Sequence, residues 1–584
     1  MPTENCEAVQ NYYIGVDVGT GSARACVIDH QGNIAGLASQ DIQTWRPHPE
    51  YYEQSTSNIW NSICVAVKDA VHQCGAPASS IQGLAFDATC SLAVFSRESD
   101  DPVSISSPDF TTDRNVILWL DHRAVDETKI INATNNPVLD YVGGAMSVEM
   151  EMPKILWLKN HMEPGQFQDC KFYDLADALT HLATGKETRS YCSAICKQGY
   201  LASATESRAE GWQLDFLAEI GLEGLAADDF GQLGGINGQN GQYLSAGQCV
   251  GPLSEKAAAS LGLVPGIAVG SGVIDAYAGW IGTVGAKVDL DIIGSGDERE
   301  QVAHRLAVVA GTSTCHLAMS DEKLFVPGVW GPYQNVLFPG AYLAEGGQSA
   351  TGELIRHVVE SHPAYAVASK AAKADGVHLY DFLNNHLRQE ALQKTVPHVS
   401  YLAKHFFFYG DLWGNRSPIA DPDMTGAIIG LKSDLSINNL ALHYYGALEF
   451  IALQTRQIVD TMNEHGHQIS VIFMSGSQTQ NDILVHLIAS TCELPVVLPQ
   501  YVHAAVCHGA AMLAAMAASG DSASRSKDLW TIMGQMSKPG RRVDPTTDAD
   551  EQRLLQAKYE VFLDMCFRQR EYRDLVDRKL RAVQ

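Results

Sequence analysis

Two apolar segments of this chain, roughly 290 residues apart, end in nearly the same small polar turn. Residues 12–18 lead into Gly-Thr-Gly-Ser at 19–22, and residues 305–310 lead into Gly-Thr-Ser at 311–313. A buried strand that turns through such residues presents backbone N–H groups and hydroxyls to an anion, because glycine has no side chain to obstruct a close approach. Either turn alone is common hairpin chemistry. Together they predict two loops that hold one polyphosphate between them.

The distance between the two turns is too long for a solenoid repeat, so we expect two copies of one domain type that face each other across a cleft. The length of 584 residues agrees with this, because a single hydrophobic core stops growing well below that size. After the first turn, residues 23–28 and the segment from Ile34 read as strands joined by a polar turn at 29–33. This pattern predicts three antiparallel strands at the start of the first domain.

Composition excludes several classes of function. With 41 Lys+Arg against 67 Asp+Glu, the net charge of −26 disfavours contact with nucleic-acid phosphates. No charged-then-apolar leader opens the chain, and its apolar runs stop short of the roughly 18 residues that a membrane span requires, so we expect a cytoplasmic protein. The 13 cysteines are scattered, and Cys192-x-x-x-Cys196 lacks a second ligand pair, so we expect free thiols rather than a zinc site.

The chain divides into four parts. We expect a first domain at 1–285, an acidic connecting loop at 286–304, a second domain at 305–545 and a helical tail at 546–584. The tail carries apolar residues on or near one face, which suits either docking on the body or self-association as a homodimer. Within the first domain, apolar runs end at Asp87, Asp121 and Asp275, which predicts polar side chains at strand ends.

Four motifs that follow one another in order carry a family resemblance. They are Asp17-x-Gly19-Thr20-x-Ser22-x-Arg24, Gly311-Thr312-Ser313, Glu345-Gly346-Gly347-Gln348-Ser349-x-x-Gly352 and Ser475-Gly476-Ser477-x-x-x-Asn481. The set spans nearly the whole chain and resembles the FGGY carbohydrate kinases. Members of that family are α/β proteins in which two actin-like ATPase (ribonuclease H-like) domains face each other across a central cleft. They transfer the terminal phosphoryl group of ATP to a hydroxyl of a sugar or polyol.

Within the family, residues 148–156 and the segments around Asp87 and Glu345 are most similar to the ribulokinase branch. Residues 330–340 are more similar to the eukaryotic D-ribulokinase-type members. The resemblance therefore implies a kinase that uses ATP and Mg²⁺ to phosphorylate D-ribulose, with L-ribulose, another pentulose or a pentitol as alternatives. The chain departs from the family pattern at Ser475, where many members have glycine, and at His503, where many have an acidic or small residue.

The resemblance assigns Asp275 as the catalytic base, since a carboxylate at the floor of a cleft can take the proton of the attacking hydroxyl. On the residues alone, an aspartate at a strand end that caps the next helix is the simpler interpretation. Asp17, at the end of the first strand, would hold Mg²⁺, which prefers few carboxylates together with phosphates. A carboxylate that hydrogen-bonds within its own hairpin is the alternative for Asp17.

The resemblance also implies two sets of binding residues. For the nucleotide they are Gly19, Thr20, Gly21, Ser22, Arg24, Gly311, Thr312, Gly352, Gly476, Ser477 and Asn481. For the sugar they are Asp87, Cys90, Lys154, Asp275 and Glu345. Arg24 also fits a surface ion pair, Lys154 a solvent-facing helix lysine, and the turn at 475–477 ordinary helix capping. Asp121 and Arg123 either reach the sugar or pair with each other.

Two other classes of function stay open. A chaperone-like or structural relative of actin would keep both turns but bind protein instead of sugar, and a sugar sensor would bind without catalysis. Asp275 and the Lys154 segment argue against the first, and Asp17 and Asp275 argue against the second. A dehydrogenase is excluded, because the first turn lacks the third glycine of the dinucleotide fingerprint. For a kinase we expect sugar binding to draw the domains together and expel water.

Overall fold

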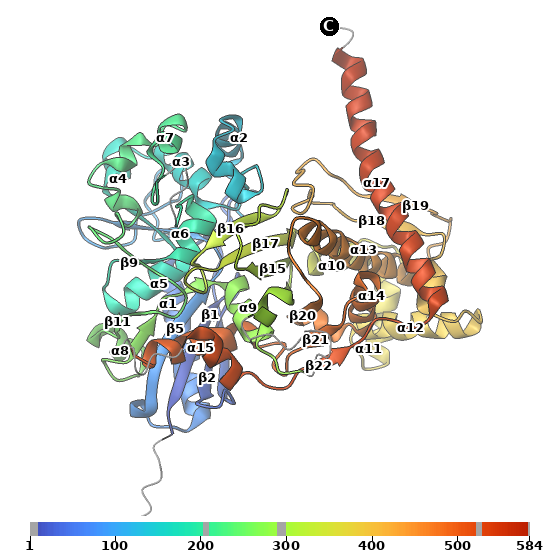
Figure 1. Cartoon of the computed structure of the whole chain (residues 1–584), viewed down its shortest axis with the longest axis horizontal. Coiled ribbons are helices and arrows are strands. Elements are labelled where there is room, and N and C mark those ends of the chain that lie inside the picture. Colours follow the sequence, from blue (N-terminus) through green and yellow to red (C-terminus); the bar gives the residue numbers. More distant parts are fainter. Residues whose placement is uncertain (1–9, 203–208, 289–299, 521–527, 582–584) are drawn as a thin grey trace, which may run out of the picture.

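The computed structural model describes residues 10–202, 209–288, 300–520 and 528–581. Two lobes lie beside each other, the first in blue to green and the second mainly in yellow to red (Figure 1). Each lobe is built around one seven-stranded sheet. The predicted α/β fold with two domains is therefore confirmed.

The first sheet has the strand order β11-β12-β5-β1-β2-β3, and β13 also pairs with β5. β1 (Tyr12–Val18) is antiparallel to β2 (Ser22–Asp29) and parallel to β5 (Ile81–Ala88). β2 in turn pairs antiparallel with β3 (Ile34–Asp41), so the three antiparallel strands predicted at the start are confirmed. The remaining strands are β11 (Cys249–Pro252), β12 (Ala268–Gly270) and β13 (Val273–Ile274).

The second sheet repeats this arrangement. Its order is β16-β17-β15-β14-β20-β21-β22. β14 (Arg305–Ala310) is antiparallel to β15 (Thr314–Ser320) and parallel to β20 (Val471–Ser475), as β1 is to β2 and β5. The similar turns in the sequence thus belong to the same hairpin of two similar sheets. The other strands are β16 (Trp330–Gln334), β17 (Tyr342–Gln348), β21 (Val496–Leu498) and β22 (Arg541–Val543).

Two helices pack tightly against each other between the sheets. α9 (Asp275–Val284) and α15 (Ala505–Ala518) cross where Gly282 and Gly509 bring their backbones together. A Cβ atom on Gly282 would lie 1.9 Å from the Ala505 carbonyl oxygen, so no other residue fits without moving a helix.

α15 also covers the first sheet. A Cβ atom on Gly15 of β1 would lie 2.2 Å from the Cys507 carbonyl oxygen, and one on Gly83 of β5 would lie 2.1 Å from that of Ala514. The alanine- and glycine-rich composition of α15 permits this approach. In the sequence the helix falls in the range 305–545, whereas in space it packs on a sheet of the first lobe (Figure 1).

The first lobe also contains a smaller sheet with the order β4-β7-β6-β8. Its strands are β4 (Glu53–Gln54), β6 (Leu92–Ser96), β7 (Val116–Ile117) and β8 (Cys170–Asp174), and β9 (Thr188–Ser190) pairs with β10 (Gln242–Leu244). The helices are α1 (Thr56–Cys74), α2 (Val125–Ala133), α3 (Glu151–His161), α4 (Pro164–Asp169), α5 (Leu175–Thr184), α6 (Tyr191–Gln198), α7 (Leu214–Glu219) and α8 (Glu255–Leu261).

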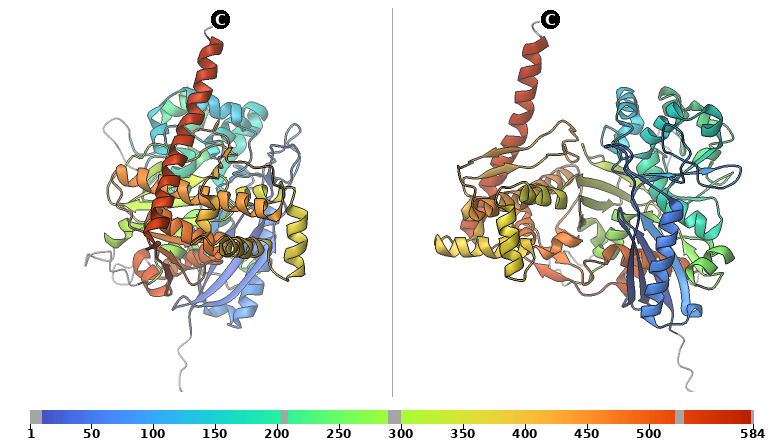
Figure 2. Two further views of the ribbon diagram at one scale, coloured as in Figure 1. Left: turned by 90° about the vertical axis from the view of Figure 1, so that its right-hand side faces the viewer. Right: turned by 180° about the vertical axis from the view of Figure 1, so that it is seen from behind.

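The second lobe packs most of its helices around the long, largely buried α13 (Ile437–Glu464). The others are α10 (Gly352–Glu360), α11 (Tyr365–Ala374), α12 (Leu379–Gln393), α14 (Asp482–Cys492) and α16 (Leu529–Met536), and β18 (Phe407–Tyr409) pairs with β19 (Ala427–Ile429). α17 (Ala549–Arg581) packs on this lobe through Leu555 and Phe562 and then extends away from it (Figure 2).

Most of the predicted acidic loop, residues 289–299, lies outside the described residues, and Glu300–His304 forms a short 3-10 helix. Within the ranges that the structure describes, none of the helices combines the length and apolar character that a membrane span demands.

Candidate functional site

A cavity of about 560 Å³ opens between the two sheets. The first lobe contributes Asp17, residues 19–22 and Asp275 to its lining, and the second lobe contributes residues 311–313, Glu345 and Gly476. The two turns that were predicted to act together therefore line the same cavity.

Each turn is closed by a backbone hydrogen bond from its first glycine. The Gly19 N–H donates to the Ser22 carbonyl oxygen over 3.0 Å, and the Gly311 N–H donates to that of Ser313 over 2.8 Å. Trp119 adds a hydrogen bond from its indole Nε1 to the Thr20 hydroxyl, 3.1 Å long. The first turn is thus fixed by its own backbone and by an aromatic ring that also lines the cavity. This order suits a loop that receives phosphate oxygens without reorganising.

Three carboxyl groups meet at the ends of neighbouring strands beneath the first turn. Asp17 on β1 is register partner of Asp87 on β5, and β13, which pairs with the same part of β5, leads directly into Asp275. Asp17 accepts an ion pair from Arg24 at 2.8 Å, while its Oδ1 is buried and has no hydrogen-bond partner among the described residues. Burial raises the pKa of Asp17, and Arg24 opposes that rise.

Asp87 lies behind Asp17 rather than on the cavity wall. It is fully buried, and neither of its oxygens has a hydrogen bond of ordinary geometry among the described residues. Burial, together with the charges of Asp17 and Asp275, raises the pKa of Asp87 well above its usual value. The structure therefore does not bring this predicted sugar ligand into contact with the cavity.

Asp275 is the first residue of α9 and lines the cavity. Its Oδ1 accepts a 2.7 Å hydrogen bond from the Ala276 N–H. Burial, and next the charge of Asp17, raise the pKa of Asp275 to about 7. A carboxyl group with this pKa suits proton abstraction near neutral pH.

This pKa gives a prediction for the pH profile. A base at Asp275, the role predicted from the sequence, would work only in its ionised form, so kcat/KM for the acceptor should fall as the pH drops through about 7 and level off above it. Initial rates between pH 5.5 and 9 at saturating nucleotide measure this. A flat profile down to pH 5.5 would contradict the assignment, provided that the protein stays folded, as circular dichroism checks.

Glu345 on β17 lines the cavity from the second lobe. Its Oε2 accepts a 2.9 Å hydrogen bond from the Tyr277 hydroxyl and lies 3.5 Å from Lys197 Nζ, and its Oε1 accepts from Arg416. Burial alone would raise the pKa of Glu345, but Lys197 and Arg416 outweigh it and hold the pKa below its usual value. Glu345 is thus an oriented anion beside two cations. Cys90 lines the same cavity.

Lys154 does not reach this cavity. It is buried on α3, and its Nζ donates to the carbonyl oxygens of Leu118 at 2.7 Å, Glu149 at 3.1 Å and Trp119 at 3.3 Å. Its burial contradicts the solvent-facing alternative, and the predicted sugar contact would have to compete with these three carbonyl groups. Lys154 supports the backbone of Trp119 and Glu149, whose side chains do line the cavity.

The predicted nucleotide residues Gly476 and Ser477 lie where β20 gives way to α14. Gly476 has φ of 96° and a Cβ atom there would lie 2.2 Å from the Ala310 carbonyl oxygen, so this turn requires glycine. Gly476 and Ser477 line the cavity together with His503. Ser475, one residue earlier, forms a 2.9 Å hydrogen bond with Thr283 of α9 and so links the two lobes.

Two predicted nucleotide residues lie outside the cavity lining. Gly352 packs beneath the second turn, where a Cβ atom would meet the Gly311 carbonyl oxygen at 2.5 Å. Asn481 caps α14 by accepting from the Leu484 N–H, and it also donates to the Tyr444 hydroxyl. Both residues support the turns that line the cavity.

Asp121 and Arg123 pair with each other. Arg123 Nη2 lies 2.8 Å from Asp121 Oδ2 and 3.0 Å from Glu53 Oε1, and all three side chains are buried away from the cavity. Of the two interpretations that the sequence left open for this pair, the structure supports the structural one.

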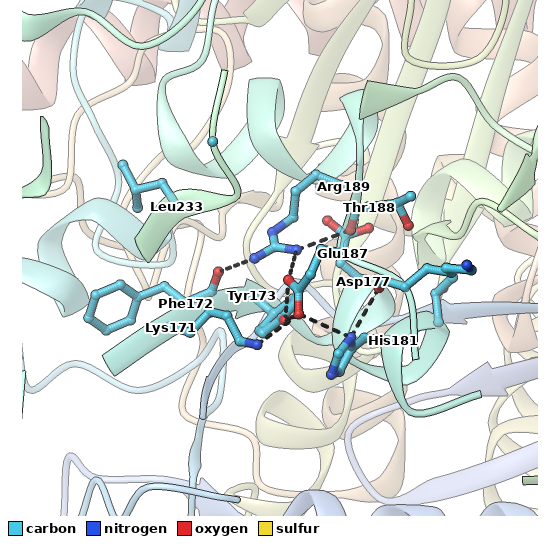
Figure 3. Close-up of polar contacts among 12 residues, drawn as sticks. Lys171, Phe172, Tyr173, Asp177, His181, Glu187, Thr188, Arg189 and Leu233 are labelled. Atoms are coloured by element: carbon cyan, nitrogen blue, oxygen red, sulfur yellow. Dashed lines mark hydrogen bonds and ion pairs between the residues drawn. The ribbon is translucent and has the colours of Figure 1, made fainter. Parts of the chain in front are cut away.

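A polar cluster on the first lobe resembles a set of metal ligands but is an ion-pair network (Figure 3). Asp100, His181 and Glu187 approach one another closely enough to share an ion. However, Lys171 Nζ already lies 3.0 Å from Asp100 and 2.7 Å from Glu187. Although burial opposes it, Arg189 and Lys171 lower the pKa of Glu187 to about 2. The cations of the protein itself therefore neutralise these carboxylates.

Among the cavity residues that the sequence prediction missed are Trp119, Glu149, Lys197 and Arg416. Lys197 directly follows Cys196, and the only sequence signal interpreted in this segment was its pair of cysteines. Glu149 stands in the segment 148–156, which carried the resemblance without a role for this side chain. Arg416 lies between Asn415 and Ser417 in a polar turn that has no helical or strand period to draw attention to it.

Comparison with known proteins gives two family matches. Residues 12–202 match the N-terminal domain of the FGGY family of carbohydrate kinases, and residues 306–518 match its C-terminal domain. A D-ribulokinase of Saccharomyces cerevisiae is 49% identical over 90% of this chain and 74% of its own length. A human FGGY carbohydrate kinase domain-containing protein is 42% identical over 96% of this chain and 97% of its own length.

Solved structures share the architecture at lower identity. The xylulose kinase of Rhodospirillum rubrum superposes with a TM-score of 0.72 at 20% identity, covering 96% of this chain and 99% of that one. The glycerol kinase of Plasmodium falciparum, solved with ADP, has a TM-score of 0.67 at 15% identity, covering 95% and 98%. At these identities the match concerns the fold alone.

Proposed function

Since the chain belongs to the FGGY family of carbohydrate kinases, which are ATP-dependent phosphotransferases, we propose that it phosphorylates D-ribulose to D-ribulose 5-phosphate. The observation that carries the choice of sugar is the 49% identity with the yeast D-ribulokinase over nine-tenths of the chain. The cavity supports a polyhydroxylated acceptor, because Glu345, Lys197 and Asp275 offer both acceptors and a donor to hydroxyl groups.

In the proposed reaction Asp275 takes the proton from the terminal hydroxyl of the sugar as that oxygen attacks the γ-phosphorus. The bond from the γ-phosphorus to the β,γ-bridging oxygen breaks, and ADP leaves. The turns at 19–22 and 311–313 hold the phosphates from the two lobes, and Gly476 and Ser477 accommodate the nucleoside. Glu345 and Lys197 fix the far end of the sugar.

Asp17 fits a Mg²⁺ ion, because the residue lines the cavity beside the first turn and its Oδ1 has no hydrogen-bond partner among the described residues. When bound, the ion would offset negative charge on the transferred phosphoryl group. Arg24 keeps Asp17 oriented through the 2.8 Å ion pair. The role of Arg24 is thus to position a carboxylate, in addition to lining the cavity.

We propose that sugar binding closes the two lobes, which keeps water away from the γ-phosphate. The contact between Tyr277 of the first lobe and Glu345 of the second supports this, because it joins the lobes at the sugar end of the cavity.

A panel of sugars tests the proposed function. Purified protein with Mg²⁺ and ATP should release ADP in the presence of D-ribulose, with a kcat/KM at least about tenfold above that for L-ribulose, D-xylulose or ribitol. Coupled detection of ADP measures the rates, and mass spectrometry of the product identifies the phosphate ester. A control without sugar gives the background of ATP hydrolysis. If D-ribulose gives no rate above that background, the proposed function is wrong.

A further inference from the structure

Arg416 is the least expected member of the cavity. It comes from the loop between β18 and β19 of the second lobe, and only 9% of its side chain is exposed. Its Nη2 bonds Glu345 Oε1, and its Nη1 lies 3.9 Å from Glu149 of the first lobe. The guanidinium therefore contacts the proposed sugar ligand Glu345 directly and also faces the other lobe.

Arg416 is confined to one position by its surroundings. Its guanidinium stacks on the Trp330 ring, 4.0 Å from the ring centroid. On the β17 side, a Cβ atom on Gly347 would lie 2.8 Å from Arg416 Cζ, so the planar group packs directly on the backbone of this strand. Lys197 contacts the same indole at 4.4 Å. A flat cation fits between a ring and a backbone, whereas an ammonium group does not replace it there.

The orientation of Glu345 depends on this contact. Its Oε2 is held by Tyr277 and Lys197, and the described partner of its Oε1 is Arg416. Without the guanidinium, the carboxylate loses one of two opposed sets of donors and is free to turn about its terminal bond. Glu345 would then no longer present a fixed acceptor to a sugar hydroxyl.

The loop that carries Arg416 is tied to the C-terminal helix. Asn415, the preceding residue, exchanges two backbone hydrogen bonds with Asp421, at 2.9 and 3.0 Å. The Asp421 carboxylate, 14% exposed, bonds Arg573 of α17 and lies 3.8 Å from Arg570 Nε. Both arginines lie in the C-terminal half of α17. The extended helix is thus two short links away from the sugar end of the cavity.

We propose that Arg416 is a positioning residue for the sugar pocket, and that α17 keeps it in place through the pair of Arg573 with Asp421. This inference rests on the proposed function, in that Glu345 contacts the sugar. It gives the C-terminal helix a role in catalysis by the same chain. The helix stabilises the loop between β18 and β19, and Arg416 of that loop fixes Glu345. Nucleotide binding, which uses the other end of the cavity, does not depend on either link.

Steady-state kinetics of substitution variants test the proposal. Arg416→Lys should raise KM for the sugar by about tenfold or more, because it removes a hydrogen bond to a charged and buried partner. Arg573→Ala should raise the same KM by about threefold, the size expected of a partly exposed ion pair. Arg573→Lys should keep the sugar KM close to the wild-type value, since the pair with Asp421 requires a positive charge and not a planar guanidinium group. KM for ATP should stay within twofold of wild type in each variant.

Arg568→Ala is the matched control. Arg568 lies on the same helix with 51% exposure, and the described ion pairs of its side chain are with Asp564 and Glu571 of that helix itself. It should leave the sugar KM unchanged. The double variant Arg573→Ala with Asp421→Asn should be no worse than the more severe single variant, because both changes break one link. Melting temperatures of all variants identify any general loss of folding.

Two results would overturn the proposal: sugar KM values within twofold of wild type for both Arg416→Lys and Arg573→Ala, or an equal rise for Arg568→Ala. Kinetics are measured with whichever sugar of the panel the wild type phosphorylates fastest. Failure of D-ribulose as a substrate would therefore overturn the proposed function and leave this test intact. If no sugar is phosphorylated, quenching of tryptophan fluorescence by the panel sugars gives the same comparison as dissociation constants, since Trp330 contacts Arg416.

Discussion

Replacement of Asp275 by asparagine should lower kcat for sugar phosphorylation by about 10²–10⁴-fold, the range that a lost general base costs. The amide is almost the same size and keeps an oxygen to accept from the Ala276 N–H, so α9 still begins in the same way. It does not accept the proton of the attacking hydroxyl. The substitution removes a negative charge from the cluster with Asp17 and Asp87, so it adds no repulsion between the protein and the nucleotide phosphates.

Rapid-quench or coupled assays with saturating sugar and ATP measure this loss. The dissociation constant of ADP, obtained by calorimetry, should change by less than about threefold and serves as the control for folding of the site. An Asp275→Asn protein with wild-type kcat would show that another group removes the proton.

Replacement of Gly509 by valine should lower the free energy of unfolding by about 3 kcal/mol, the upper part of the range for overpacked cores. A Cβ atom at this position would lie 2.0 Å from the Ala278 carbonyl oxygen, and the atom it meets is backbone, which has no alternative rotamer. α9 and α15 would have to separate. Because α9 begins at Asp275 and α15 carries Cys507 beside Asp17, the same change should also lower kcat.

Urea denaturation followed by circular dichroism measures the loss as a lower midpoint. Gly534→Ala is the matched control, since Gly534 lies in α16 and an added Cβ atom meets nothing within 4 Å there. That variant should be as stable as wild type or slightly more stable, because alanine favours helix over glycine by about 1 kcal/mol. Equal midpoints for Gly509→Val and wild type would contradict the tight crossing of the two helices.

The features that could be predicted from the sequence are those set by residues close to one another along the chain. The turns at 19–22 and 311–313 and the strand-end position of Asp275 follow from apolar runs that stop at small or acidic residues. The backbone sets these positions directly. Where a central strand of the sheet ends, the next residue lies at the edge that the carboxyl ends of the parallel strands form. For that reason the short motifs were enough to predict both the family and the residues at the base of the cavity.

The parts that escaped prediction depend on where a long side chain or a distant helix comes to lie. Lys154 and Lys197 are both helix lysines, and only tertiary packing sends one to three carbonyl groups and the other to Glu345. Asn481 was predicted at the nucleotide, and the structure shows that its side chain also caps a helix, a role that the sequence alone does not distinguish from the first. No local pattern indicates that α15 crosses to the sheet of the other lobe.

That crossing has a consequence for the order in which the chain is made. Residues of β1 and β5 leave the ribosome early, but the helix that packs on Gly15 and Gly83 is encoded close to the opposite terminus. One face of the first sheet therefore stays exposed until α15 has been synthesised, which is after most of the second sheet. The lobe that is first in translation is completed last, so a nascent or truncated chain exposes an apolar face that a chaperone would have to shield until synthesis ends.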